Sequence, residues 1–143
     1  MLRMIEIEKS FNIGTINEKE IFKGLNLTIN DGDFITVIGG NGAGKSTMLN
    51  LIAGVHKADG GRIILDGEDL TYKNETQRAK YIGRVFQDPM MGTAPTMMIE
   101  ENLAMAYRRT KRRTLAWGIS QKEREMYKES LAQLGLGLED RMK

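Results

Sequence analysis

The chain has 143 residues, a length within the range of a single domain. Its composition, 41% hydrophobic and 28% charged residues, is typical of a soluble globular protein and not of a disordered one. The absence of cysteine excludes disulfides, thiolate catalysis and cysteine-ligated zinc. The formal net charge of +2 is too small to argue for a nucleic-acid partner, and we expect none.

The N-terminus does not read as a targeting segment. Residues 1–6 lack the apolar stretch of a signal peptide, and no apolar run in the sequence is long enough to cross a bilayer. A cytoplasmic location is therefore the default expectation.

The first third of the chain carries strand patterns. Residues 4–9 alternate between isoleucine and glutamate, and residues 25–29 alternate between apolar and polar side chains, so each segment predicts a strand with one solvated face. A turn at residues 31–33 then leads into residues 34–38, a short apolar run that is typical of a buried strand.

The strongest functional signal follows directly. Residues 39–47 fit the pattern of glycine, four residues, then Gly-Lys-Ser/Thr. The stretch consists of Gly39, Gly40, Asn41, Gly42, Ala43, Gly44, Lys45, Ser46 and Thr47. The apolar residues after it recur at helical spacing: Met48, Leu49, Ile52 and Val55. The pattern therefore lies between a predicted strand and a predicted helix, which is the context a phosphate-binding loop requires.

The residue types in this loop suit a polyphosphate. Glycines let the backbone turn tightly and aim successive N–H groups inward, and the helix that begins near Lys45 adds its positive dipole end. Lys45 would reach the β- and γ-phosphates, and the Ser46 hydroxyl would ligate Mg²⁺. An ordinary glycine-rich turn is the alternative. The flanking elements favour a nucleoside triphosphate site.

Residues 62–65 followed by Asp66 allow two interpretations. An apolar strand that ends in aspartate is typical of the second nucleotide motif, in which the carboxylate reaches Mg²⁺. However, Gly67 follows, and Asp-Gly after a strand is a strong turn signal. Glu68 also stands one residue beyond the place of a water-positioning carboxylate. We favour a hairpin turn.

The next candidate site residue is Gln87. Residues 75–80 predict a short helix and residues 81–86 a strand, which Pro89 ends. Open α/β sheets bind ligands just beyond their strand ends, so Gln87 is well placed to approach the same magnesium ion and phosphate. A solvent-exposed loop glutamine is the alternative.

The C-terminal third predicts helices. Residues 99–109 read as one helix, and a capping box at residues 120–123 opens another. The second helix carries an apolar stripe until Gly135 stops it: Tyr127, Leu131 and Leu134. Core packing is the favoured role of this stripe, with a docking surface as the alternative.

The sequence does not decide the roles of three features. The basic run at residues 108–113 suits lipid headgroups or an acidic partner loop, and equally a solvated segment between helices. Methionines gather after Gln87 and suit either an adaptable contact surface or core filling: Met90, Met91, Met97, Met98 and Met105. His56 has no partner motif and receives no role.

Together these residues resemble the ATP-binding subunit of ATP-binding-cassette (ABC) transporters. Five features carry the resemblance: residues 39–47 (Walker A), 24–33 (the strand and turn before it), 61–67 (an antiparallel hairpin), 86–89 (the Q-loop) and Phe11 (an adenine-stacking aromatic). The sequence departs from the family pattern at Gly40, where a bulkier residue or proline is common, and at Phe11, where tyrosine is usual. Neither departure removes a phosphate contact.

The resemblance implies an α/β fold of the ABC type of P-loop NTPase, with a parallel core sheet, an antiparallel β-subdomain and the start of a helical subdomain. Residues 1–89 would form the nucleotide-binding core with the β-subdomain, and residues 90–143 a partial helical subdomain. Lys45 and Gln87 would be catalytic, Ser46 and Gln87 would hold Mg²⁺, and Phe11 with residues 39–47 would bind ATP.

The resemblance also implies partners. These are transmembrane permease subunits and a second ATP-binding subunit, with the protein peripheral on the inner face of the cell membrane. The leading function is therefore the ATP-binding component of an ABC transport system. A soluble non-transport ABC-type ATPase and an inactive ATP-binding fragment remain the alternatives.

After Leu134 the family would continue with a signature sequence, an aspartate-carboxylate strand and a switch histidine, none of which occurs in residues 135–143. We therefore expect a truncated N-terminal portion that binds ATP without hydrolysing it in isolation.

Overall fold

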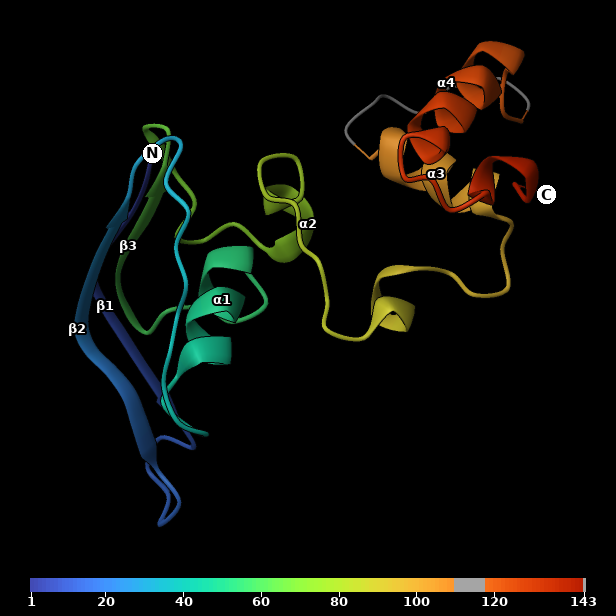
Figure 1. The fold of residues 1–143 in the computed structure, drawn as a ribbon. Coiled ribbons are helices and arrows are strands. Elements are labelled where there is room, and N and C mark those ends of the chain that lie inside the picture. The colour runs from blue at the N-terminus through green and yellow to red at the C-terminus, as the bar shows by residue number, and fades with distance from the viewer. Residues whose placement is uncertain (110–117, 143) are drawn as a thin grey trace. The chain divides into compact units, whose positions relative to one another are not determined.

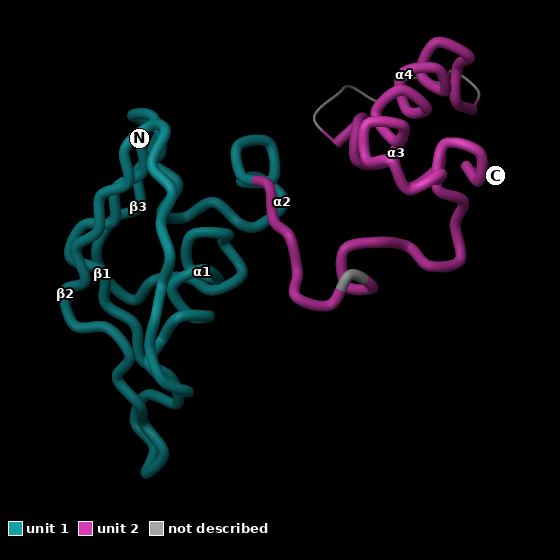
Figure 2. The backbone as a smooth tube through the Cα atoms, viewed as in Figure 1, with its two compact units in different colours: residues 1–82 teal, residues 83–143 magenta. Residues whose placement is uncertain are grey.

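The computed structural model describes residues 1–109 and 118–142. The chain divides into two compact units, Met1–Ile82 and Gly83–Lys143 (Figure 2). Each unit is described by itself below. No helix in the described ranges is both long enough and apolar enough to cross a membrane.

The first unit is built on a four-stranded sheet (Figure 1). Its strands are β1 (Leu2–Phe11), β2 (Lys19–Ile29), β3 (Gly60–Leu65) and β4 (Glu68–Asp69), in the spatial order β2-β1-β3-β4. Every pair of neighbours is antiparallel. The three alternating or apolar segments near residues 4–9, 25–29 and 62–65 are thus confirmed as strands.

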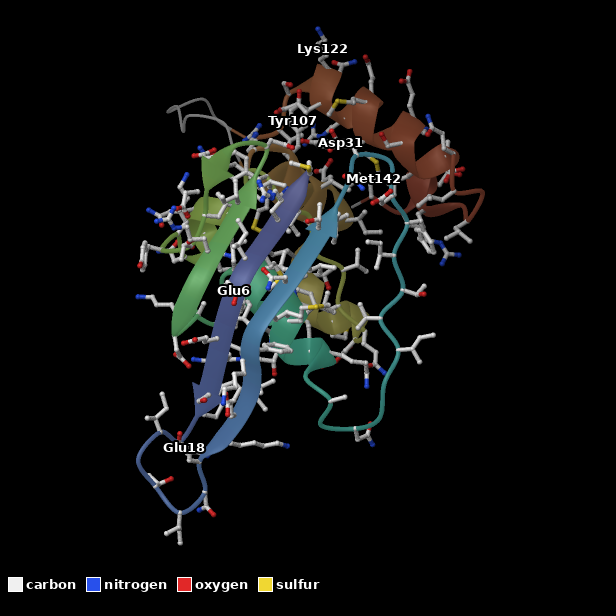
Figure 3. All side chains as sticks on the ribbon, turned by 90° about the vertical axis from the view of Figure 1, so that its left-hand side faces the viewer. Glu6, Glu18, Asp31, Tyr107, Lys122 and Met142 are labelled. Atoms are coloured by element: carbon white, nitrogen blue, oxygen red, sulfur yellow. The ribbon has the colours of Figure 1, made fainter. Side chains whose placement is uncertain are left out.

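The central strand β1 changes phase at Glu6. A regular alternation would bury Ile5 with Ile7, but Glu6 has a φ of 48° and the β1–β3 register shifts between Ile5 and Glu8. Such a bulge inserts an extra residue and turns the following side chains over. The buried apolar residues of β1 are consequently Leu2, Met4 and Ile7. Figure 3 shows Glu6 midway along this strand.

Helix α1 (Lys45–Ala53) packs against one face of this sheet (Figures 1 and 3). Its Leu51 is completely buried in a cluster with residues from β1, from β3 and from the segment after β4: Leu2, Met4, Ile7, Ile63 and Leu70. Met48 and Ile52 pack against the same cluster. The expected stripe is therefore corrected, because the helix contacts the sheet through positions 48, 51 and 52 and leaves Leu49 and Val55 exposed.

Two predicted strands are not observed. Residues 34–38 and 81–86 form no ladder with any strand that the structure describes, and Phe34, Ile38 and Val85 are each more than 90% exposed. A strand exists only through hydrogen bonds to a neighbouring strand, and an apolar run without such a neighbour stays irregular. The observed sheet is accordingly antiparallel, and the expected parallel core sheet is not formed by the described residues.

A buried guanidinium joins α1 to the short helix α2 (Glu75–Arg78). Arg78 is 1% exposed. Its Nη1 donates to the carbonyl oxygens of Leu51 (2.6 Å) and Ile52 (2.8 Å) in the last turn of α1. Its Nε donates to Lys73 O (2.8 Å) and its Nη2 to Thr71 O (3.2 Å). Burial lowers the pKa of Arg78, but a cation at a helix C-terminus is favoured by the dipole. Arg78 therefore fixes the helix that follows the glycine loop.

The second unit contains a 3₁₀ turn η1 (Pro89–Gly92), α3 (Ile99–Tyr107), α4 (Gln121–Ala132) and a 3₁₀ turn η2 (Leu138–Asp140). The capping box that opens α4 is confirmed, since Ser120 Oγ accepts from the Glu123 N–H and the Glu123 carboxylate accepts from the Ser120 N–H. Tyr127 and Leu131 are buried. Leu134 lies beyond the helix and is 59% exposed, so the buried stripe is shorter than expected.

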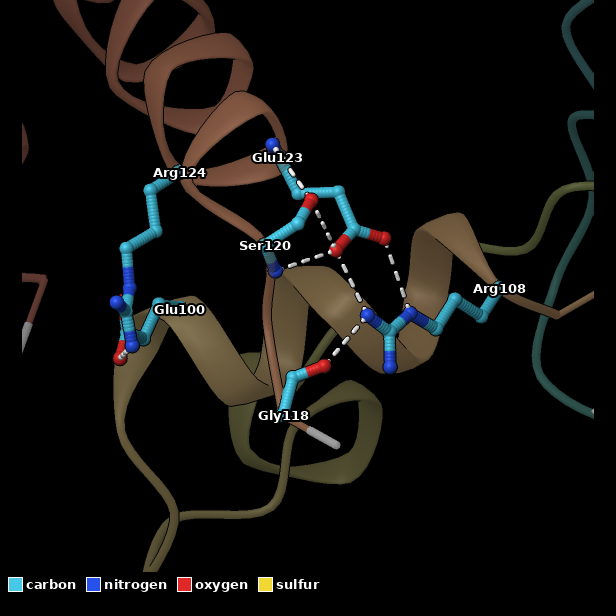
Figure 4. A network of polar contacts seen from close by, with 6 residues as sticks. All are labelled: Glu100, Arg108, Gly118, Ser120, Glu123 and Arg124. Carbon is cyan, nitrogen blue, oxygen red and sulfur yellow. Dashed lines mark hydrogen bonds and ion pairs between the residues drawn. The ribbon is translucent and has the colours of Figure 1, made fainter. Parts of the chain in front are cut away.

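Two ion pairs tie α3 and the residue after it to α4, and a hydrogen bond from Arg108 to the Gly118 carbonyl reaches the segment before α4 (Figure 4). The buried Glu100 carboxylate accepts from Arg124 Nε at 2.8 Å, and Arg108 Nη2 donates to Glu123 Oε2 at 2.7 Å. The hydrogen bond from Arg108, followed by that from the Ser120 backbone, lowers the pKa of Glu123 to about 2. Arg108 of the basic run therefore has a structural role, whereas residues 110–113 of that run lie outside the described residues.

The methionines that follow Gln87 are not core residues in the described unit. Their exposed fractions range from 36% to 68% for Met90, Met91, Met97, Met98 and Met105.

Candidate functional site

The glycine loop, residues 39–44, lies against the start of β2. Gly44 precedes α1 with a φ of 91°, a backbone conformation that residues with a Cβ rarely adopt. A Cβ at this position would also lie 2.9 Å from Ile21 Cγ2 and 3.0 Å from Phe22 Cζ. Only glycine therefore allows β2 to support the loop this closely. The sequence pattern indicated the need for glycine but not this contact.

Lys45, the first residue of α1, folds back over the loop. Its Nζ donates to the carbonyl oxygens of Gly39 (2.5 Å) and Gly40 (2.8 Å). A Cβ on Gly39 would lie 3.2 Å from Ala43 Cβ, which is tighter than an ordinary contact, whereas its 3.9 Å distance from Lys45 Cδ would be an ordinary van der Waals contact. An ammonium group has three donors, and two are used here. The third donor has no acceptor among the described residues and is chemically suited to an anion.

The electrostatics at this helix start favour an anionic ligand. No Asp or Glu occurs between Asp33 and Asp59, and the first turn of α1 contains no acidic residue. Helix starts commonly carry a carboxylate that neutralises the positive dipole end. Here that end is left with the Lys45 ammonium, the exposed Ser46 hydroxyl and the half-buried Thr47. This combination of backbone N–H groups, cation and hydroxyl is chemically suited to phosphate oxygens.

Phe11, the expected base-stacking residue, ends β1 in a small polar and aromatic cluster. Its ring meets the His56 ring edge-on, with centroids 5.3 Å apart, and Lys9 Nζ lies 5.3 Å from the ring centroid. Asp59 holds this cluster, because it accepts from Lys9 Nζ (2.7 Å) and from the Ser10 N–H (2.7 Å). Burial acts to raise the Asp59 pKa, but these hydrogen bonds outweigh it, and the pKa is lowered. Phe11 is only half-buried, so its ring retains exposed surface.

Replacing Phe11 with alanine is expected to lower the affinities for ATP and for GTP to the same extent, about fivefold. An aromatic stacking contact contributes about 1 kcal/mol and does not depend on the hydrogen-bonding groups of the base. Binding of tripolyphosphate should be almost unchanged. Competition binding against a fluorescent ATP analogue measures all three. A loss of tripolyphosphate affinity equal to that of ATP would instead assign Phe11 a purely structural role beside His56.

Gln87 lies in the second unit and is exposed, one residue before Asp88, whose carboxylate accepts from the Met90 N–H at 2.9 Å. The strand that was expected to carry Gln87 to a sheet edge is not observed. Its proposed approach to the metal therefore stays a prediction.

The hairpin interpretation of Asp66 is confirmed. Leu65 pairs with Glu68 across the antiparallel β3–β4 turn, and Asp66 takes a φ of 49° within it. The Asp66 carboxylate accepts from the N-terminal ammonium of Met1, as does Asp31. Glu68 pairs with Lys73, and this contact lowers the Glu68 pKa. Within the described residues, no group of three or more carboxylate or imidazole side chains could hold a metal ion.

A glycine loop that opens a helix, on an antiparallel sheet that supports the loop, is the arrangement of a candidate P-loop unit. The model of the family described as "ABC transporter" matches residues 22–143. The chain belongs to this family.

Curated relatives share substantial identity with the chain. It is 42% identical over 111 residues to a tyrosine transport ATP-binding protein of Clostridioides difficile (strain R20291), covering 78% of this chain and 44% of the relative. It is 40% identical over 111 residues to the spermidine/putrescine import ATP-binding protein PotA of Pasteurella multocida (strain Pm70), covering 78% of this chain and 28% of that protein.

Solved structures show the same fold. The ADP conformation of MJ1267, an ATP-binding cassette of an ABC transporter, matches with a TM-score of 0.73 at 29% identity, over 100% of this chain and 56% of that one. A dimeric, post-hydrolysis structure of the cassette MJ0796 bound to ADP and Pi matches with a TM-score of 0.72 at 24% identity, over 93% and 57%. The chain thus spans less than half of these curated relatives and just over half of these solved cassettes.

Proposed function

We propose that the chain is the ATP-binding portion of an ABC-type transport ATPase subunit, which energises transport in the complete protein. The observation that carries this proposal is the position of Lys45 on the loop carbonyls, at a helix start that contains no carboxylate. The names of the relatives support a transport role, since one is a tyrosine transport protein and the other imports spermidine and putrescine.

The residues fit Mg²⁺-ATP in a specific way. Loop residues 39–47 would bind the phosphates, Lys45 would contact the β- and γ-phosphates, and Phe11 would stack on adenine. The Ser46 hydroxyl and the Gln87 side-chain oxygen would hold Mg²⁺, a hard cation that prefers oxygen ligands. Bound Mg²⁺ would neutralise developing charge on the phosphates.

The complete protein is proposed to add what this chain lacks. Later strands would pair with residues 34–38 and 81–86 into a parallel core sheet, giving a core at residues 1–89 and a helical subdomain from residue 90 onward. A second ATP-binding subunit and transmembrane permease subunits would be the partners, on the cytoplasmic side of the cell membrane. The dimeric MJ0796 cassette supports the pairing of two such subunits.

The 143-residue chain is expected to bind ATP without sustained turnover. Hydrolysis requires a group that orients the attacking water, a bound metal and stabilisation of charge on the γ-phosphate. Lys45, Ser46 and Gln87 supply part of this set, while Asp66 and Glu68 are engaged at a hairpin turn. Phosphate release from Mg²⁺-ATP and equilibrium ATP binding are measured on the same purified sample.

The Lys45→Ala variant is the control for both measurements. ATP binding that is lost in this variant, together with background phosphate release in both proteins, is the expected result. Sustained turnover that Lys45→Ala abolishes would contradict the expectation and return Asp66 or Glu68 to the catalytic candidates. Equal ATP binding by both proteins would contradict the proposed function itself.

A further inference from the structure

A second lysine lies beside the glycine loop. Lys19 is the first residue of β2, and its Nζ would be 3.4 Å from a Cβ placed on Gly42. Among the residues that the structure describes, no other heavy atom outside Gly42 and its two chain neighbours lies within 4 Å of that position. The Lys19 ammonium is therefore the group that borders this side of the loop.

The strand holds Lys19 in this place. Two residues further along β2, Ile21 and its neighbour Phe22 lie against Gly44 of the same loop. Lys19 also pairs across the sheet with Phe11, the candidate adenine contact. The start of β2 thus lies against the loop at both Gly42 and Gly44. The backbone of β2 therefore helps to place Lys19 beside the loop, in addition to the conformation of its flexible side chain.

Lys19 has no carboxylate partner within residues 1–109 and 118–142. Other lysines of the first unit are paired, such as Lys9 with Asp59 and Lys73 with Glu68. The neighbouring Glu18 is directed elsewhere, because its Oε2 accepts from the Gly14 N–H at 2.9 Å. A cation beside a loop that itself contains no carboxylate adds to the positive potential of that loop.

We propose that Lys19 is a second phosphate-binding cation, which contacts the nucleotide phosphate chain on the Gly42 side of the loop. This inference rests on the proposed ATP-binding function and deepens it. Lys45 and Lys19 would hold the phosphates from two elements, the start of α1 and the start of β2. Phe11, paired with Lys19, would place the base next to this contact. The end of β1 would then contact the base through Phe11, and the start of β2 would contact the phosphates through Lys19.

The test compares Lys19→Gln with the parent chain for binding of ATP, ADP and AMP by calorimetry. ATP affinity should fall about fivefold or more, ADP affinity less, and AMP affinity hardly at all, since a charge-assisted contact scales with the charge of the phosphate chain. Raising the salt concentration should reduce the difference between variant and parent, because Lys19 is exposed and salt screens exposed charges. Lys19→Arg should retain most of the affinity.

The matched control is Lys23→Gln, which removes an exposed lysine from the same strand and should leave all three affinities unchanged. An equal loss for AMP and ATP, or no loss for either, would overturn the proposal. Lys45→Ala separates the two levels of inference. If Lys45→Ala lowers ATP binding and Lys19→Gln does not, only the role of Lys19 fails. If neither variant changes ATP binding, the proposed function fails.

Discussion

Replacing Lys45 with alanine is expected to lower ATP affinity about tenfold or more, the equivalent of losing a charge-assisted contact of about 1.5–3 kcal/mol. The change also removes the hydrogen bonds from Lys45 to the Gly39 and Gly40 carbonyls, so the start of the loop is no longer held to the start of α1. Both effects act in the same direction. Titration of a fluorescent ATP analogue into the two proteins measures the loss.

The number of phosphates provides the internal check. Lys45 is proposed to contact the terminal phosphates, so the loss should be large for ATP and small for AMP. Lys57→Ala is the matched control, because Lys57 is an exposed lysine of the segment that follows α1 and should leave the affinity unchanged. A uniform loss across ATP, ADP and AMP would indicate a disordered loop and not a missing phosphate contact.

Replacing Arg78 with methionine is expected to lower the free energy of unfolding of the first unit by about 3 kcal/mol, since buried carbonyl groups left without a donor cost about 1–3 kcal/mol each. Arg78 serves four of them: those of Leu51, Ile52, Thr71 and Lys73. The substitution has an opposing effect, because it removes a buried charge. Burial of that charge is unfavourable, and it lowers the Arg78 pKa. We expect the hydrogen bonds and the helix dipole to outweigh it.

Urea unfolding followed by circular dichroism tests this balance on the full chain, with the exposed Arg3→Met as the control for loss of positive charge. Faster amide exchange in α1 should accompany the shift, because Arg78 caps that helix. A more stable Arg78→Met protein would show that desolvation of the charge dominates. An unchanged midpoint would show that the carbonyl groups find water in its place.

The local signals in the sequence were sufficient for several elements. Alternation predicted β1 and β2, Asp66-Gly67 predicted the β3–β4 turn, and the capping box at Ser120 predicted the start of α4. These signals act between residues that are close in the chain, where backbone conformation and near-neighbour hydrogen bonds decide the outcome. The glycine pattern likewise located the candidate site, because it specifies a backbone shape.

Contacts between distant residues were decided only in the folded chain. The bulge at Glu6 changed which residues of β1 are buried, although the alternation in the sequence is regular. Residues 34–38 have the composition of a buried strand, yet composition does not supply the neighbour with which a strand must pair.

Some contacts of the candidate site could be predicted from the sequence, and others are visible only in the folded structure. The sequence by itself predicted a phosphate-binding pattern at residues 39–47 and a helix that begins near Lys45, and α1 does begin at Lys45. It contained no signal that Arg78 would reach the carbonyls of Leu51 and Ile52, or that Lys19 would lie beside Gly42. These contacts join segments more than twenty residues apart, and only the packing of α1 and the loop against the sheet brings them together.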